Sequence, residues 1–440
     1  MKQTCDTIFT AAFVVTQNET RTVIPQGAIA VSGNRIAAVG PASDIASAWE
    51  AGETVSLDNA ALMPGLINGH THIPMSALRG YSDDKNLMDW LTKDIFPIEA
   101  HLTPEIIRTA SEFSCAEMMR TGTTAFYDMY MHERSVFQAA DRMGMRAVMG
   151  ESMTHFFPGL SAASEQELRD LILALAEEWK GHPRIKGAIV PHAIYTTGPD
   201  FLQRCRALAD ELGWQFGMHL SETSGETERC LKQHGQRPVE YCRSLGILRP
   251  DTTLFHMVDT DGEDLDTIAE AGCAIVHNPA SNMKLTSGAA PIEAMLSRGI
   301  PVGLGTDGPA SNNSQNMVRE MYLCSLLQKL DTMDPTALPA QTALDMATRG
   351  SARALHWEGL GTIEPGSIAD FVALGLDEPN MQPVHNIVSN IVYAATGLEN
   401  RLTVVDGRIL YREGRYLSCD YEALKGEIAA IRQWIASKAS

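Results

Sequence analysis

The stretch that decides the fold reads Leu62-Met63-Pro64-Gly65-Leu66-Ile67-Asn68-Gly69-His70-Thr71-His72-Ile73-Pro74. An apolar run ends here in two histidines that lie two positions apart. Side chains alternate between the faces of an extended strand, so the imidazoles of His70 and His72 point the same way. Two imidazoles supply only part of a catalytic zinc shell, which has a third protein ligand and an open position for water. The pair predicts further ligands at other strand ends, although two packed or exposed histidines would give the same pattern.

The bulk composition predicts a globular protein with an acidic surface. Hydrophobic residues make up 44% of the 440 residues and charged residues 20%, so the chain can bury a full core. The formal net charge of -19 repels nucleic acid and anionic membranes, so we expect neither as a partner. The eight scattered cysteines, with no Cys-x-x-Cys pair, are typical of reduced thiols in a cytoplasmic protein. No apolar run has the length of a membrane span.

The distribution of strand-like runs predicts two domains. Between residues 61 and 362, short apolar runs alternate with longer amphipathic stretches, as in a (β/α)8 barrel, although an open doubly wound sheet gives similar local signals. Residues 1–60 and 363–440 instead carry short β-like runs separated by turn residues. We therefore expect an α/β protein with a TIM barrel, a small β-sandwich domain built from both chain ends, and a terminal helix. Two independent hairpins capping the core are the alternative for the chain ends.

Polar residues follow most of the expected barrel strands. These strands cover residues 62–68, 123–129, 146–150, 185–190, 215–220, 253–257, 274–277 and 301–305. In a TIM barrel the carboxyl ends of the strands converge, and the active site lies there. Six of the strands end in His70 and His72, His192, His219, His256, His277, and Asp307. One such residue alone is more often a packed core histidine or a capping aspartate, whereas six together favour a site.

The residue types at these ends predict a metal-dependent hydrolytic site. His219 is the natural third imidazole and Asp307 the natural carboxylate, giving three nitrogen ligands, one oxygen ligand and room for water. Asp307 is also placed to take a proton from that water. Glu222 follows His219 by three residues and is expected to transfer protons, and His256 to stabilise an oxyanion by hydrogen bonding. Strand four carries its lysine, Lys186, near its beginning, so we expect no bridging lysine and a single metal ion.

Together, the histidine-containing run, the spacing of the polar strand ends and the flanking sheet segments resemble the amidohydrolase superfamily over nearly the whole chain. Four shorter stretches are similar to the branch of deaminases that acts on S-adenosylhomocysteine and 5'-methylthioadenosine. These stretches are 86–91, 95–99, 191–195, and 311–313 ahead of Glu320 and Met321. The resemblance implies hydrolytic deamination: water activated by the metal adds to C6 of adenine, and ammonia leaves to give the inosine analogue.

The same resemblance implies roles for particular residues. It implies one zinc ion per subunit, with iron(II) as the alternative, held by His70, His72, His219 and Asp307. It also implies a small nucleoside-like substrate as partner, and it allows a homo-oligomer. For substrate binding it implies three residues: Glu99, which would contact the ribose hydroxyls, His192 and Glu222. The alternative for Glu99 is a surface position on a helix.

Two departures from the family pattern leave the substrate open. Members of this branch often carry arginine in the loop after strand three, but here residues 151–158 contain none, and Arg146 lies at the other end of that strand. Asn316 stands where an acidic residue is usual. Phe156 and Phe157 would suit an apolar group or a stacked ring, so 5'-methylthioadenosine and adenosine remain candidates beside S-adenosylhomocysteine.

Two other functions compete with adenine deamination. An aminohydrolase acting on guanine, a pyrimidine or an s-triazine would use the same scaffold, but Glu99 and His192 favour a substrate with ribose. A catalytically silent relative that only binds purines is the alternative of a different class. The presence of all four candidate ligands together with Glu222 and His256 speaks against it.

Overall fold

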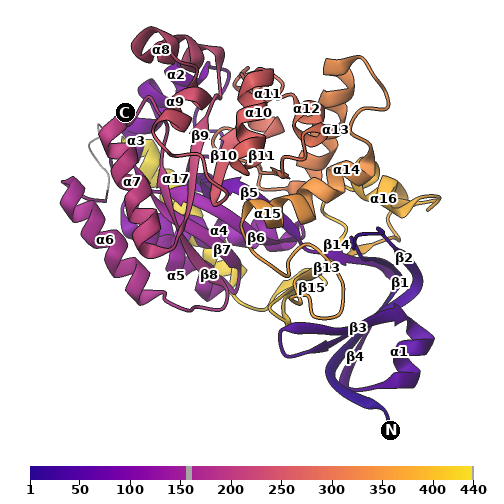
Figure 1. Cartoon of the computed structure of the whole chain (residues 1–440). Helices are drawn as coiled ribbons and strands as arrows, with labels where there is room; N and C mark the ends of the chain where they lie inside the picture. Colours follow the sequence, from indigo (N-terminus) through magenta and orange to yellow (C-terminus); the bar gives the residue numbers. More distant parts are fainter. Residues whose placement is uncertain (155–160, 439–440) are drawn as a thin grey trace.

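The chain forms two eight-stranded sheets (Figure 1). The structure is a computed structural model that describes residues 1–154 and 161–438, so Phe156 and Phe157 lie outside the described residues. One sheet is a parallel barrel made by the middle of the chain, and the other is drawn from both chain ends. The expected α/β fold, a (β/α)8 barrel with a second sheet from the two ends, is therefore confirmed.

The barrel strands follow one another in chain order, and each is parallel to its neighbours. They are β5 (Leu66–Thr71), β6 (Thr123–Tyr130), β7 (Arg146–Met153), β8 (Ile185–Pro191), β9 (Gln215–Leu220), β10 (Thr252–His256), β11 (Ala274–His277) and β12 (Val302–Leu304). A parallel bridge between Thr71 and Asp307 joins the first strand to the segment that follows the last. The Asp307 backbone N–H donates to the His70 carbonyl at 3.0 Å. The ring thus closes at two of the predicted metal ligands.

The prediction of a single barrel strand at 62–68 is wrong, because residues of two different strands make up this run. Strand β4 (Trp49–Pro64) belongs to the terminal sheet, and β5 begins at Leu66 in the barrel. Gly65 is the joint between them. A Cβ atom at this position would lie 2.0 Å from Thr124 Oγ1, so only glycine lets the chain pass this close to β6.

The terminal sheet has the strand order β16-β15-β14-β13-β4-β1-β2-β3. Its other strands are β1 (Gln3–Val15), β2 (Val23–Ser32), β3 (Arg35–Pro41), β13 (Phe371–Gly375), β14 (Asn400–Val405), β15 (Arg408–Arg412) and β16 (Arg415–Tyr416). Strand β13 pairs antiparallel with β4, and this ladder joins the two ends of the chain. The rings of Phe9 and Phe371 lie 4.9 Å apart in the sheet's core. Two independent hairpins are thereby excluded.

Helices surround the barrel, apart from α1 (Ala42–Ala48), which packs on the terminal sheet (Figure 1). The α-helices are α1 (Ala42–Ala48), α2 (Leu87–Trp90), α3 (Phe96–Glu99), α4 (Pro104–Arg120), α5 (Glu133–Met143), α6 (Glu165–Glu178), α7 (Pro199–Leu212), α8 (Ser224–His234), α9 (Pro238–Ser244), α10 (Gly262–Ala271), α11 (Pro279–Lys284), α12 (Ile292–Ser297), α13 (Met317–Thr332), α14 (Ala340–Asp345), α15 (Ser351–Ala354), α16 (Ile387–Ser389) and α17 (Tyr421–Lys438). The final helix, α17, lies against α4 and buries Leu424, Ile431 and Ile435. Within the described ranges no helix has the length and apolar character of a membrane span.

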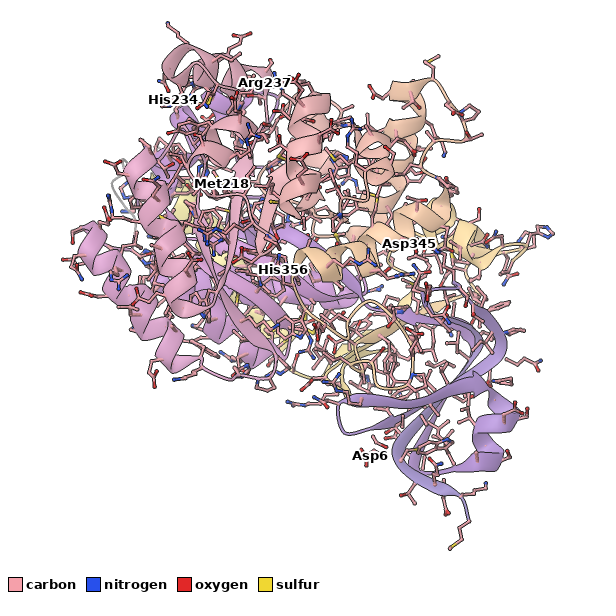
Figure 2. All side chains as sticks on the ribbon, in the orientation of Figure 1. Asp6, Met218, His234, Arg237, Asp345 and His356 are labelled. Carbon is pink, nitrogen blue, oxygen red and sulfur yellow. The ribbon has the colours of Figure 1, made fainter. Side chains whose placement is uncertain are left out.

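Side chains fill the space between the strands and the helices (Figure 2). Met218, on β9, is fully buried. His356, labelled in Figure 2, lines a hollow together with Arg35 and Asp406 of the terminal sheet region. Inside the barrel, Ile67, Tyr127, Val148 and Phe255 pack against one another, and polar groups gather in the hollows at its two ends.

Candidate active site

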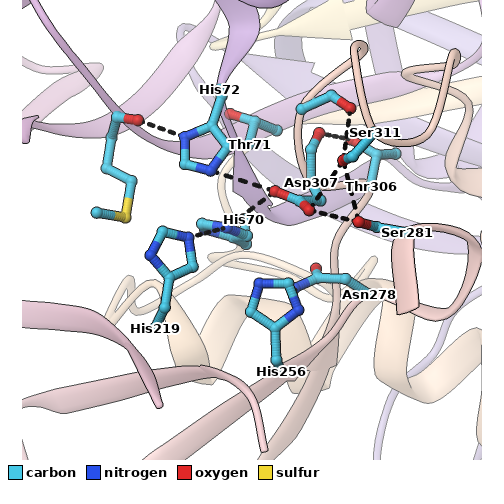
Figure 3. Close-up of polar contacts among 12 residues, drawn as sticks. His70, Thr71, His72, His219, His256, Asn278, Ser281, Thr306, Asp307 and Ser311 are labelled. Carbon is cyan, nitrogen blue, oxygen red and sulfur yellow. Dashed lines mark hydrogen bonds and ion pairs between the residues drawn. The ribbon is translucent and has the colours of Figure 1, made fainter. Parts of the chain in front are cut away.

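The four predicted metal ligands lie together at the carboxyl end of the barrel strands (Figure 3). The Nε2 atoms of His70 and His219 are 3.1 Å apart. Asp307 Oδ1 lies 3.4 Å from His70 Nε2 and 3.2 Å from His72 Nε2. His70, His219 and Asp307 are buried, and the His72 side chain is only slightly exposed. Residues more than two hundred positions apart thus present nitrogen and oxygen atoms to one small volume.

His256 completes this cluster of polar groups. The potential ligand atoms of His70, His219, His256 and Asp307 all lie within 4.8 Å of one another. The Nδ1 atom of His256 is 2.8 Å from Asn282 Oδ1, and its Nε2 atom is 4.0 Å from Glu222 Oε2. His256 therefore stands between the candidate metal ligands and Glu222, where sequence reasoning expected it to act by hydrogen bonding.

The backbone is strained at this end of the barrel. His256 has a φ of +75° and Asp307 a φ of +61°, both in the left-handed region that non-glycine residues rarely adopt. Such conformations cost free energy and concentrate at functional sites, where the surrounding structure holds them. The strain aims both side chains into the pocket.

Hydrogen bonds fix how the candidate ligands are turned. His72 Nδ1 donates to the Met129 carbonyl at 2.5 Å, and His219 Nδ1 donates to the His192 carbonyl at 2.9 Å. Because a carbonyl only accepts, both rings carry the proton on Nδ1 and turn Nε2 toward the cluster. This arrangement is typical of metal-ligating histidines.

Two serines hold the carboxylate of Asp307. Its Oδ2 atom accepts from Ser281 Oγ at 2.6 Å and from Ser311 Oγ at 3.0 Å, which leaves Oδ1 facing His70 and His72 (Figure 3). Ser311 belongs to the stretch 311–313, which supported the family resemblance. Ser281 carried no signal in the sequence, because a single serine after a strand is too common to stand out.

The electrostatics of the cluster favour a cation. Burial lowers the pKa of His70 to about 3, and burial together with the neighbouring imidazoles lowers the pKa of His219 well below its usual value. Burial also lowers the pKa of His72, but Asp307 outweighs it and raises that pKa to about 9. Burial raises the pKa of Asp307, but His70 and His72 outweigh it and hold that pKa far below its usual value. The buried carboxylate of Asp307 thus faces the neutral imidazole of His70 and a proton that it holds on His72, with neutral His219 beside them. A divalent metal ion in place of that proton would fit this donor set of imidazole nitrogens and one carboxylate oxygen.

The three predicted substrate-binding residues line the same pocket as the cluster. Glu99, on α3, is only 5% exposed and accepts a hydrogen bond from the Tyr130 hydroxyl at 2.5 Å, so it is not a surface residue. Burial raises the pKa of Glu99 to about 7, against the opposing effect of the Tyr130 hydrogen bond. The ring of His192 lies 4.8 Å from that of His219. Burial also raises the pKa of Glu222, above the usual range of a glutamate.

The wall of the pocket is largely apolar. Among the described residues that line it there is no lysine or arginine. Its apolar members are Met75, Leu87, Trp90, Leu91, Phe96, Ala100, Met129, Met131 and Leu285. Neither this wall nor the role of Tyr130 could be read from the sequence, because both arise where the segment 87–99 meets barrel residues that are distant along the chain.

The remaining sequence expectations fall outside this pocket. His277 does not line it and instead has its Nδ1 atom 3.4 Å from Asn282 Nδ2. Asn316 caps α13, where its side chain accepts from the Val318 N–H at 3.0 Å. Lys186 and Arg146 lie at the opposite end of the barrel, around Trp357. Neither cation is near the candidate metal ligands.

Comparison with known proteins identifies the family. Residues 61–410 match the amidohydrolase family, and residues 27–49 match a bacterial imidazolonepropionase-like composite domain. A 5-methylthioadenosine/S-adenosylhomocysteine deaminase from Nitratidesulfovibrio vulgaris is 50% identical, over 100% of this chain and 99% of its own length. A protein of the same name from Lawsonia intracellularis is 48% identical over the same shares.

A solved structure agrees with these relatives. An adenosine deaminase from Xanthomonas campestris, solved with bound zinc, superposes with a TM-score of 0.97 at 35% identity. The match covers 99% of this chain and 100% of that one. The chain thus belongs to the amidohydrolase family and, within it, to the 5-methylthioadenosine/S-adenosylhomocysteine deaminase family.

Proposed function

We propose that this protein is a zinc-dependent aminohydrolase that deaminates an adenine nucleoside or its thioether to the inosine analogue and ammonia. The substrates proposed are 5'-methylthioadenosine, S-adenosylhomocysteine and adenosine. The observation that carries the proposal is the cluster of buried imidazoles around Asp307, on the floor of a pocket that also holds Glu99 and Glu222. The names of the full-length relatives support the same reaction.

In this proposal His70, His72, His219 and Asp307 hold the metal. When bound, the ion would polarise a water molecule and lower its pKa, so that a nucleophile forms at neutral pH. Iron(II) is the alternative to zinc, and one ion per subunit is proposed. Imidazole nitrogens with one carboxylate suit either metal, and the zinc-bound structural relative favours zinc.

The chain's own residues carry the proton transfers. Burial raises the pKa of Glu222, so its carboxyl can hold a proton and donate it to a ring nitrogen of adenine. His256 Nδ1 is engaged by Asn282, which leaves Nε2 to accept a proton from the attacking water. Once protonated, that nitrogen can donate a hydrogen bond to the oxygen that develops at C6. Asp307 is a second proton acceptor beside the same water.

The other residues of the pocket orient the substrate. Glu99 offers carboxylate oxygens to the two adjacent ribose hydroxyls, and His192 contacts the substrate beside His219. The apolar wall accommodates the rest of the nucleoside and excludes water from the reaction. Exclusion of water strengthens each of these electrostatic contacts.

The test is ultraviolet absorbance of each candidate substrate incubated with zinc-loaded protein, since conversion of adenine to hypoxanthine changes the spectrum. We expect turnover of at least one of the three. Guanine, a pyrimidine and an s-triazine, assayed in parallel for ammonia release, serve as rival substrates. Turnover of a rival alone, or of none of these compounds by protein that contains metal, would overturn the proposal.

We also propose a cellular location, a subunit arrangement and a domain division for this protein. A cytoplasmic location is supported by the eight free cysteines, and a homo-oligomer by the family alone. The domain division is proposed at 1–60, 61–362 and 363–440, in line with the two separate sheets. Metal analysis and sedimentation of the purified protein test the ion and the subunit number.

A further inference from the structure

The end of strand β6 contacts both parts of the candidate site. Asp128 Oδ1 accepts from the Thr71 hydroxyl at 2.5 Å and from the Ile73 N–H at 2.7 Å, on either side of His72. The next residue, Met129, accepts from His72 Nδ1 through its carbonyl. Tyr130 ends the strand and donates its hydroxyl to Glu99. Three consecutive residues therefore fix the His72 segment on one side and Glu99 on the other.

Glu99 itself does not lie on the barrel. It ends α3, a helix of four residues that follows the π-helical turn Leu91–Ile95, and both belong to the segment that covers the pocket. The terminal torsion of a glutamate is broad, so nothing intrinsic to the side chain sets the direction of its oxygens. The Tyr130 hydroxyl, 2.5 Å from Oε1, is the contact that ties this carboxylate to the barrel wall.

The position of Tyr130 suits this hydrogen bond to Glu99. Its side chain is 4% exposed, and it lines the pocket beside Glu99. A phenol that donates to Oε1 leaves Oε2 and the remaining lone pair of Oε1 to accept from two adjacent hydroxyls. Strand β6 is hydrogen-bonded to β5 and β7 on both sides, so the phenol has a rigid base.

We propose that Tyr130 is a positioning residue that orients the Glu99 carboxylate toward the sugar hydroxyls and sets their distance from the metal-binding cluster. This inference rests on the proposed function, because it assumes a substrate with a ribose. It assigns to Tyr130 a part in substrate selection that works only through Glu99. A substrate without ribose hydroxyls gives Glu99 nothing to bind and makes Tyr130 irrelevant.

The test compares adenosine with 2',3'-dideoxyadenosine in Tyr130→Phe. With adenosine we expect KM to rise roughly tenfold, the usual scale for one hydrogen bond to a charged group, with kcat changed much less. With the dideoxy compound we expect the parent and the variant to have the same kcat/KM. Metal content, measured independently of activity, should equal that of the parent.

Two further variants make the result decisive. Tyr127→Phe is the matched control, because Tyr127 lies on the same strand, is fully buried, and has a hydroxyl without a hydrogen-bond partner among the described residues. It should leave both substrates unaffected. Glu99→Gln should lose the preference for adenosine over its dideoxy analogue, and adding Tyr130→Phe to it should cost little more, since the two act as a unit.

The outcomes separate this inference from the proposed function. If the parent deaminates adenosine but Tyr130→Phe impairs both substrates equally, or lowers kcat with KM unchanged, the positioning role is wrong while the function stands. If the parent deaminates neither compound but turns over one of the rival rings, the proposed function fails first.

Discussion

The two ends of the barrel both bury charged groups, but they balance them with different residues: arginine at the lower end, where the strands begin, and histidine at the upper end, where they finish. There Arg146, which is 1% exposed, donates to Asp370 Oδ2 at 2.7 Å and to Asp406 Oδ1 at 2.9 Å. Its guanidinium also lies 4.9 Å from the centre of the Trp357 ring. At the upper end, Asp307, Glu99 and Glu222 are buried in a pocket whose described lining holds no lysine or arginine.

This difference separates a structural site from a functional one. Taking a charge out of water costs several kcal/mol unless partners compensate it. At the lower end, Arg146 of the barrel and Asp370 and Asp406 of the C-terminal segment compensate one another and tie the two sheets together. At the upper end, the charge that compensates Asp307 is a proton on His72, whose pKa is raised to about 9, and a bound metal ion would take the place of that proton.

The largest expected effect comes from removing the central carboxylate of the upper end. Asp307→Asn should abolish stable metal binding and lower kcat/KM about 10⁴-fold or more, because activation of water by the metal is worth several kcal/mol. Metal analysis and steady-state kinetics measure both. Asp406→Asn, at the lower end, should keep its metal. Full metal content in Asp307→Asn would remove Asp307 from the ligand set.

Glu222→Gln should separate proton transfer from metal binding. We expect kcat to fall about 10³-fold, which is typical of a lost general acid or base, while the metal content stays that of the parent. The isosteric amide keeps the shape of the side chain and removes the titrating group. A variant that turns over substrate as fast as the parent would contradict the mechanism.

Arg146→Met should lower the stability of the fold at the lower end of the barrel and leave the activity of the site at the upper end unchanged. Removing one partner of a buried ion pair leaves Asp370 uncompensated, so we expect the free energy of unfolding to fall by about 3–5 kcal/mol. Urea denaturation measures this change, and kcat of the folded fraction should stay the same. The control is Arg204→Met, because Arg204 pairs with Glu165 at the surface and such pairs contribute about 0–1 kcal/mol. Equal effects from both substitutions would refute the assignment of the lower end as a structural joint.

The smallest effect is expected for the serine that holds Asp307. Ser281→Ala removes one of the two hydroxyls on Asp307 Oδ2 and leaves that of Ser311. Loss of a hydrogen bond to a metal ligand typically lowers metal affinity about 10–100-fold. Competition with a chromophoric chelator measures it, and Ser297→Ala, whose hydroxyl bonds to Ala294 on the surface, is the control. An unchanged affinity in Ser281→Ala would show that Ser311 suffices.

The barrel topology and the candidate metal ligands could be predicted from the sequence, because they depend on the order of strands along the chain. The contacts that depend on packing could not. Each candidate ligand follows a short apolar run, so strand ends and barrel topology together bring His70, His219 and Asp307 to one place. The passage from one sheet to the other at Gly65 was missed, because an apolar run has the same pattern in either sheet. Tyr130 and Asn282 were missed because their partners, Glu99 and His256, become neighbours only in the folded chain.

The ladder between β4 and β13 has a consequence for how the protein is made. Phe371 pairs with Pro64, so the β4 edge of the nascent N-terminal sheet has no partner until the ribosome has translated the whole barrel. At about 5–20 residues per second this delay lasts on the order of tens of seconds. An open strand edge is a template for another chain. A polysome holds several nascent copies close together, and those that have passed β4 but not reached β13 would carry such edges near one another, which exposes the protein to misassembly during synthesis.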